Sequence, residues 1–591
     1  MSILKRFFIS MLGSLAAIWI SMMLIVVLVM LLTVSAVVSS VSSKSTVKIK
    51  DGTVLVLNLD AVVEERPIKP DFMDIINREP QPASLSAIVS AIGAAAEDDR
   101  IDGISIECSG ASAGFASREA VRGALADFKK SGKWVVSYAD VYAQGDYYIA
   151  SVADSMFLNP VGAIDLHGVA TGIPFFKGFM DKVGVEMQVV KVGTFKSAVE
   201  PYILTEMSEA NRLQTKVYLD ALWGEMVSAV SESRGIPAAT LNQYADSMVA
   251  FTPADSLPGM GLVDGLVYRH VYEDMLKDLT GCDHDKDLRA VDVSKYLESG
   301  AEAPHSAENR NKIAVYYACG DITESGRDGI ASDRVVPDIL KLAEDDDIDA
   351  LVLRVNSGGG SAFASEQIWH ALEVFKEKGK TFYVSMGDYA ASGGYYISCG
   401  AKKIYAQPMT LTGSIGIFGM IPCVKELVSG KLGVNFDYVG TNANAASIGI
   451  FEPLTPFQRH RLQSEINRGY ELFTKRCADG RHMSQDSIKA VAEGRVWDGR
   501  SALRIGLVDE LGSLADAAAD LAREMGYKDY QLVTYPSASD SFWELLSQLE
   551  AEMRANAVRE ELGQFYPAYR EIKKFESMSP VQARMETVII D

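Results

Sequence analysis

The chain has 591 residues, more than one hydrophobic core usually supports, so we expect at least two folded units. Hydrophobic residues make up 48%, and a formal net charge of -21 argues against a nucleic-acid partner, whose binding energy would come from phosphate neutralisation. The six cysteines are scattered, with no CxxC pair and no histidine at metal-ligand spacing, so no metal or cofactor is indicated.

The first segment of the chain is typical of a membrane anchor. Lys5 and Arg6 precede residues 7–38, which carry no charge, and about 20 apolar residues can cross a bilayer. A cleaved signal peptide is the alternative, because Val-Ser-Ala at 34–36 resembles a cleavage site, but its apolar region is typically about 7–15 residues long. We therefore predict an uncleaved anchor over residues 1–44, with the bulk of the chain outside the cytoplasm.

The rest of the sequence is duplicated. Residues 97–103, Glu-Asp-Asp-Arg-Ile-Asp-Gly, recur at 344–350 as Glu-Asp-Asp-Asp-Ile-Asp-Ala, and an apolar run follows in both places. Residues 132–149 match 379–397, with Gly-Lys, a later Asp and Tyr-Tyr-Ile in the same order. The chain therefore contains two copies of one domain.

Within each copy, short β-rich runs alternate with helical patterns. We expect strands over 53–59, 313–317 and 381–385, and helices over 85–96 and 362–378. This alternation is typical of an α/β fold with helices packed on a mainly parallel sheet.

Linker composition suggests the domain boundaries. A stretch at about 299–311, rich in Glu, Ala, Pro and Ser, separates the copies, which we assign to 45–300 and 301–540. The tail over 541–591 has no counterpart in the first copy. It looks helical and charged, and then irregular from Ser577.

The copies differ in four segments, and chemistry is best sought there. Residues 356–361, Asn-Ser-Gly-Gly-Gly-Ser, lie between a predicted strand and a predicted helix, where the first copy has Ser-Gly-Ala-Ser-Ala at 109–113. Consecutive glycines expose backbone N–H groups, as an oxyanion hole or a phosphate cradle requires. A simple tight turn is an equally good interpretation of this segment alone.

The second segment surrounds Ser392 with small residues. Residues 388–396 read Asp-Tyr-Ala-Ala-Ser-Gly-Gly-Tyr-Tyr, a strand–helix junction at which we expect the hydroxyl to be exposed. The matching residue in the first copy, Gln144, cannot act as a nucleophile. A helix N-cap is the simpler reading of one serine, but the glycine-rich segment upstream favours a nucleophile.

A nucleophilic serine needs a base, and none of the seven histidines suits that role. Residues 192–201, Val-Gly-Thr-Phe-Lys-Ser-Ala-Val-Glu-Pro, hold Lys196 among small and apolar residues, whereas the second copy has Ala443 there. A basic amine must be neutral, which burial favours; an exposed lysine is the alternative. In the fourth segment, Ser414 could orient the amine or be a turn residue.

At these four segments the sequence resembles the signal peptide peptidase A family, in its long bacterial form. The stretches at 192–201 and 390–396 match the family's motifs nearly letter for letter, and the resemblance spans about residues 50–535. Members commonly carry Pro at the position of Gly358. The resemblance implies tandem Clp-protease/crotonase-like α/β domains, with the base in the first copy and the nucleophile in the second.

The same resemblance implies a serine endopeptidase with a Ser/Lys dyad. Lys196 would be the base, Ser392 the nucleophile and Ser414 the orienting residue, without a cofactor. Backbone N–H groups near the glycines would stabilise the oxyanion; these are Gly359, Gly360 and Gly393.

The resemblance also suggests substrates and surroundings. Expected substrates are signal peptide remnants and similar hydrophobic peptides, and expected partners are the lipid bilayer and further copies of the chain in a bowl-shaped homotetramer. The expected location is the bacterial inner membrane, with a single span and the bulk of the chain in the periplasm.

Two other functions are alternatives. A crotonase-like acyl-CoA enzyme also uses glycine-rich oxyanion holes, but it would need carboxylate bases near the glycines and a cytoplasmic location. A non-catalytic membrane scaffold could bind peptides, but degeneration should then have removed the chemistry of both copies. Instead, one copy retains the lysine and the other the serine.

Overall fold

A computed structural model describes residues 11, 13–15, 17–23, 25, 48–59, 63–66, 83–110, 112–301, 305–326, 329–536, 558, 559, 561–563, 566 and 581–585. Most of the predicted anchor, and most of the tail after residue 540, lie outside these residues. No helix in the described part of the chain is both long and apolar enough to cross a membrane.

The first copy is built on a six-stranded sheet in the order β6-β4-β3-β2-β1-β7, in which neighbouring strands are parallel. The strands are β1 (Thr53–Leu59), β2 (Ile101–Cys108), β3 (Trp134–Tyr142), β4 (Ser155–Ile164), β6 (Gly265–Leu266) and β7 (Ala290–Asp292). The strand predicted over 53–59 is therefore confirmed.

The second copy repeats this plan in an eight-stranded sheet. Its main path is β17-β15-β13-β11-β8-β19, and β14 and β18 extend it from β13. The strands are β8 (Lys312–Cys319), β11 (Ile348–Ser357), β13 (Thr381–Ala391), β14 (Lys403–Ala406), β15 (Leu411–Gly413), β17 (Val496–Asp498), β18 (Glu510–Leu511) and β19 (Gln531–Tyr535). The central strand β11 is apolar and buried over Leu351–Leu353, as expected of a parallel strand covered on both faces.

Helices follow the strands in both copies. In the first they are α3 (Leu85–Glu97), α4 (Phe115–Lys129), α5 (Gln144–Ala150), α6 (Lys177–Val183), α7 (Glu200–Ile203), α8 (Glu209–Arg234), α9 (Ala238–Asp246), α10 (Arg269–Thr280) and α11 (Val293–Glu298). In the second they are α12 (Ser332–Glu344), α13 (Ala362–Glu377), α14 (Gly393–Ser398), α15 (Pro456–Arg481), α16 (Gln485–Val491), α17 (Gly499–Arg504) and α18 (Leu514–Glu524). The duplicated α/β architecture predicted from the sequence is confirmed.

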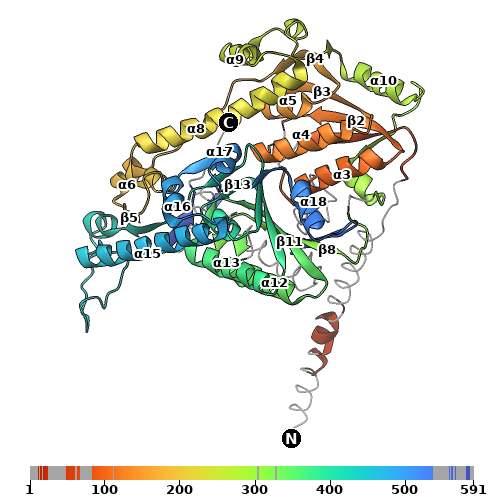
Figure 1. Ribbon diagram of the computed structural model, residues 1–591. Coiled ribbons are helices and arrows are strands. Elements are labelled where there is room, and N and C mark those ends of the chain that lie inside the picture. Colours follow the sequence, from red (N-terminus) through yellow and green to blue (C-terminus); the bar gives the residue numbers. More distant parts are fainter. Residues whose placement is uncertain are drawn as a thin grey trace.

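A third sheet joins the copies. Its order is β10-β9-β12-β20-β16-β5. The strands are β5 (Glu186–Lys191), β9 (Ile322–Thr323), β10 (Ile330–Ala331), β12 (Gly359–Ser361), β16 (Phe418–Cys423) and β20 (Val581–Arg584). Strand β5 of the first copy pairs antiparallel with β16 of the second, and Figure 1 shows β5 beside α15, with α8 above the second copy.

The prediction that the tail is irregular after Ser577 was wrong at residues 581–584. These residues form β20, which pairs antiparallel with both β12 and β16. The four residues Val-Gln-Ala-Arg carry no local strand signal strong enough to see in the sequence. Their conformation comes from the two neighbouring strands, whose backbone groups they satisfy.

Candidate active site

Ser392 lies at the junction of β13 and α14 in a strained conformation. Its φ of 56° and ψ of -111° are unusual for a residue with a side chain, and such strain is common where a hydroxyl is presented for reaction. The side chain does not cap α14, so the N-cap interpretation does not apply. The following residues must be small, because a Cβ on Gly394 would lie 2.7 Å from the Ser357 carbonyl oxygen.

The expectation that Ser392 is exposed was wrong, since its exposed fraction is 0%. The sequence could not show this, because the covering groups come from other parts of the chain. Lys196 is buried as well, with 1% exposed, which rules out the alternative of a surface lysine.

The lysine amine reaches the serine across the boundary between the copies. Lys196 Nζ lies 2.7 Å from Ser392 Oγ, although the residues are 196 positions apart. The same amine donates to the Ser414 carbonyl oxygen at 3.0 Å and lies 3.1 Å from Ser414 Oγ. Ser414 is buried and has a positive φ of 49°. The structure thus brings together the three side chains singled out in the sequence.

The glycine-rich segment lies next to the serine. Gly359 has a φ of 99°, and a Cβ there would collide with neighbouring backbone, 2.7 Å from Gly393 N, so only glycine fits. The Gly359 N–H donates to Ser357 Oγ at 3.1 Å, and the Ser392 N–H donates to the Gly413 carbonyl at 2.8 Å. These two bonds use the N–H groups of Gly359 and Ser392. Of the oxyanion donors predicted from the sequence, Gly360 and Gly393 make neither of these bonds.

Comparison with known proteins agrees with this geometry. The model of peptidase family S49 matches residues 127–281 and 374–528, one match in each copy, and that of the Clp proteases matches residues 322–412. The chain belongs to peptidase family S49. It is thus a serine endopeptidase, and the acyl-CoA and scaffold alternatives are set aside.

Relatives match most of the length of this S49 peptidase. It is 35% identical to Protease 4 of Haemophilus influenzae over 81% of this chain and 80% of the relative. It is 34% identical to Protease 4 of Salmonella typhi, over 85% and 83% of the two chains. The chloroplastic serine protease SPPA of Arabidopsis thaliana is 29% identical, over 80% and 69%.

A residue missed in the sequence, Gln214, holds the lysine segment of the S49 peptidase in place. It is 1% exposed on α8, and its Nε2 donates to the Phe195 carbonyl at 3.0 Å and to Ser197 Oγ at 3.1 Å. Its Oε1 accepts from the Val496 N–H of the second copy at 3.2 Å. No local pattern marks this glutamine, because its partners come from two distant segments.

Glu200 belongs to the lysine motif, and its role could not be predicted from the sequence. It is 2% exposed and accepts from the Ser208 N–H at 3.1 Å, from Ser208 Oγ at 2.6 Å and from Asn211 Nδ2 at 3.1 Å. These bonds tie the segment after Lys196 to the start of α8. Glu200 therefore has a structural role beside the lysine.

Asp388 docks the first copy beside the serine strand. Its carboxylate accepts from the Ser117 N–H at 2.9 Å and from Ser117 Oγ at 2.6 Å, at the N-terminus of α4. A carboxylate is favourable there because the first N–H groups of a helix lack partners within the helix. A side chain at Gly114 would collide with Asp388, so the contact also requires that glycine.

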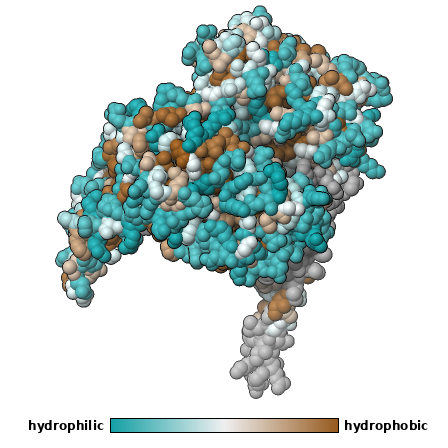
Figure 2. Space-filling view, in the orientation of Figure 1, coloured by the Kyte–Doolittle hydropathy of each residue, from teal (hydrophilic) through white to brown (hydrophobic). Residues whose placement is uncertain are grey.

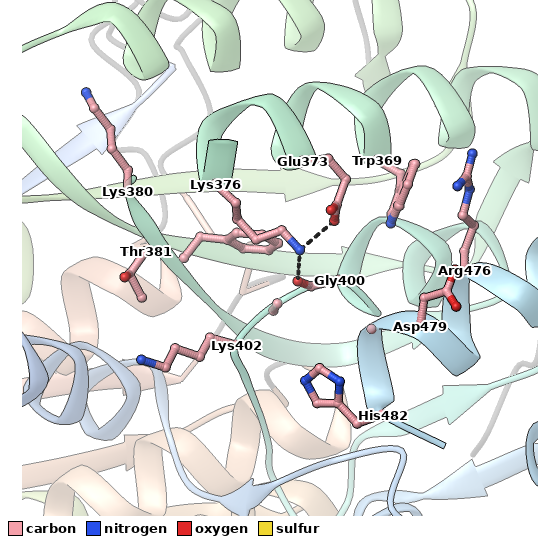
Figure 3. Close-up of a pocket in the computed structure, with 13 residues that line it drawn as sticks. Trp369, Glu373, Lys376, Lys380, Thr381, Gly400, Lys402, Arg476, Asp479 and His482 are labelled. Carbon is pink, nitrogen blue, oxygen red and sulfur yellow. Dashed lines mark hydrogen bonds and ion pairs between the residues drawn. The ribbon is translucent and has the colours of Figure 1, made fainter. Parts of the chain in front are cut away.

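A pocket of about 350 Å³ lies elsewhere, between α13 and α15 (Figure 3). Its cations already pair with carboxylates or carbonyls, since Lys376 contacts Glu373 at 2.7 Å and the Gly400 carbonyl at 2.9 Å. Arg476 likewise pairs with Glu366 at 2.6 Å. None of the predicted site residues lines this pocket. Lys196 and Ser392 are instead buried where the two copies meet.

Proposed function

We propose that this protein is a membrane-anchored serine endopeptidase in which Ser392 is the nucleophile and Lys196 the general base. The observation that carries the proposal is the 2.7 Å contact between Lys196 Nζ and Ser392 Oγ at a buried site. That distance is within the range needed for direct proton transfer. The hydroxyl and carbonyl of Ser414 hold the amine in line with the serine.

The reaction follows from these positions. Neutral Lys196 takes the Ser392 proton as Oγ attacks the carbonyl carbon of the peptide, and the tetrahedral intermediate forms. The protonated amine then gives its proton to the leaving nitrogen, which leaves an acyl-enzyme. Water enters, Lys196 takes one of its protons, and hydrolysis of the ester releases the second product and restores the serine.

The charge that develops on the carbonyl oxygen needs donors that are already in place. In this proposal the backbone N–H groups of Gly360 and Gly393 supply them, and Gly359 shapes the turn. One such donor typically contributes about 3–4 kcal/mol to transition-state stabilisation. The positive φ of 99° at Gly359 supports its role as the turn residue.

The substrates we propose are signal peptide remnants and similar hydrophobic peptides, cleaved at the outer face of the bacterial inner membrane. The uncharged run over residues 7–38, preceded by Lys5 and Arg6, supports an anchor with this orientation. An anchored site would meet such peptides where they are released into the bilayer.

Self-association is part of the proposal. Apolar side chains gather along α8 in the space-filling view (Figure 2). Two apolar residues of this helix, Leu213 and Val217, are exposed. Exposed apolar surface of this kind often marks an interface. Analytical ultracentrifugation of a chain beginning at Ser45 should give about four times the mass of one chain if the tetramer forms.

A labelling experiment tests the nucleophile. The protein is treated with a fluorophosphonate probe, digested, and the modified residue is mapped by mass spectrometry. We expect labelling at Ser392, and we expect Ser392→Ala to remain unlabelled. Labelling of another serine, with hydrolysis retained in Ser392→Ala, would overturn the assignment.

Topology is tested separately. The full chain is expressed in a bacterium, and spheroplasts are treated with external protease. We expect the bulk of the chain to be digested, and a chain beginning at Ser45 to be soluble and active. Protection of the bulk would mean that it faces the cytoplasm.

A further inference from the structure

The segment after residue 580 lies where a peptide substrate would be expected. In the third sheet, β20 lies between β12, which contains Gly359 and Gly360, and β16. It pairs antiparallel with both, Ala583 opposite Gly360 and Gln582 opposite Phe418. Without β20, the two strands would present facing edges one strand apart. Such edges bind an extended peptide through main-chain hydrogen bonds.

The register of β20 places one carbonyl beside the glycines next to Ser392. The Met585 N–H donates to the Gly358 carbonyl at 2.8 Å, so alternation along an antiparallel pair makes Ala583 and Gly360 the next hydrogen-bonded position. A Cβ on Gly359 would collide with the Ala583 carbonyl oxygen, and a Cβ on Gly393 would lie 3.0 Å from it. This oxygen therefore lies beside the two backbone segments that form the proposed oxyanion hole.

The side chains of β20 fill a site that is already shaped. Ala583 has no exposed surface, so the position whose carbonyl meets the glycines accepts only a small residue. On the opposite face, Arg584 Nη2 donates to both carboxylate oxygens of Asp321, at 2.7 and 2.8 Å. Asp321 is thus placed to recognise a basic residue immediately after the carbonyl.

We propose that residues 581–585 are a built-in occupant of the peptide groove, which substrates must displace. The occupant shows how substrates bind: extended, antiparallel to β12 and β16, with a small residue before the cleaved bond and a basic residue paired with Asp321 after it. The inference rests on the proposed function, because it takes Ser392 as the nucleophile.

The first test weakens the occupant in the full chain. Arg584→Glu places a carboxylate against Asp321, so the segment should leave the groove more often, and kcat/KM for a short fluorogenic peptide should rise at least about fivefold. Arg468→Glu makes the same charge change at an exposed arginine of α15, which also pairs with a nearby glutamate, and should leave activity unchanged. Equal activity in Arg584→Glu and wild type would overturn the proposal.

The second test uses the same variant to examine specificity. Two peptides are compared that are identical except for the residue that follows the alanine, which is arginine in one and glutamate in the other. We expect the arginine peptide to be cleaved at least about tenfold faster, and Asp321→Asn in the same background to reduce that preference. No preference in the presence of Asp321 would contradict its role.

The third test needs no substitution. Hydrogen exchange of the wild-type chain is measured with and without acetyl-Pro-Val-Gln-alaninal, whose aldehyde carbon bonds to Ser392 Oγ while its oxygen gains the hydroxyl proton. The amides of 581–585 should exchange slowly in the free enzyme and at least about tenfold faster after labelling. Unchanged protection with the aldehyde bound at Ser392 would refute the inference alone. Failure of wild type and variants to hydrolyse peptides or bind the aldehyde would instead refute the proposed function.

Discussion

Replacing Ser414 with alanine measures how far the placement of the lysine depends on one side-chain contact. Lys196 Nζ meets Ser414 twice, at the carbonyl oxygen at 3.0 Å and at Oγ at 3.1 Å, and the substitution removes only the second contact. One hydrogen bond of this kind contributes about 1 kcal/mol, which corresponds to about fivefold in rate. Because the contact between the amine and the Ser414 carbonyl is retained, the loss of rate should not exceed about fivefold.

The assay is steady-state hydrolysis of a fluorogenic peptide. We expect kcat to fall about fivefold in Ser414→Ala with KM almost unchanged, because the amine is misplaced while the peptide contacts remain. The positive φ of 49° strains any residue with a Cβ, so Ser414→Gly serves as the matched variant that removes the hydroxyl without strain. It should lose the same activity.

A second control distinguishes the loss of an orienting contact at the site from the general effect of removing a buried serine hydroxyl. Ser105 is a buried serine on β2 of the first copy, and its hydroxyl bonds to the Tyr272 hydroxyl at 2.7 Å rather than to the lysine. Ser105→Ala should cost stability but not kcat. The orienting role of Ser414 would be refuted by a loss below about twofold, or by a loss as complete as that of Ser392→Ala.

Four further outcomes are expected. Ser392→Ala should abolish hydrolysis and keep the thermal midpoint near wild type, because the replacement is small; measurable turnover would exclude it as the nucleophile. Lys196→Ala and Lys196→Arg should be equally inactive, since a guanidinium cannot accept the proton. Combining either with Ser392→Ala should reduce the rate of hydrolysis no further. Activity in Lys196→Arg would contradict the role of Lys196 as the base. Gln214→Leu keeps the side-chain volume but leaves the Phe195 carbonyl without this buried donor. The free energy of unfolding should fall by about 1–3 kcal/mol, and kcat should fall as well. An unchanged denaturation midpoint would refute this expectation. Burial raises the pKa of Glu119 to about 8 from 4.5, so the folded state holds the proton more tightly and loses stability as pH rises through 8. Glu119→Gln should therefore raise the thermal midpoint at pH 9 but not at pH 5. Equal shifts of the midpoint at both pH values would argue against the raised pKa.

The parts of the site that could be predicted are those in which one copy departs from the other. Lys196 and Ser392 stand in segments whose counterparts hold Ala443 and Gln144, so the duplication itself marked them. Ser414 was found in the same way, and the structure brings all three side chains together. The alternating pattern was equally informative for the parallel sheets, because local periodicity reports burial.

The parts that could not be predicted depend on contacts between distant segments. Gln214 looks like any polar helix residue, and only its bonds to Phe195 and Val496 reveal its role. Strand β20 has too little local sequence signal to be recognised without its neighbours. The burial of Ser392 could not be foreseen either, because it results from packing around the strand–helix junction.

The pairing of β5 with β16 has a consequence for biosynthesis. A ribosome completes the segment with Lys196 long before the one with Ser392, and in the proposed mechanism neither residue is reactive without the other. A partly made chain therefore lacks the complete pair that the proposed mechanism requires, and by that mechanism cannot cleave itself or its neighbours during synthesis. In the proposed mechanism, activity begins only when the second half has folded against the first, so the split between the copies delays proteolysis until the fold is complete.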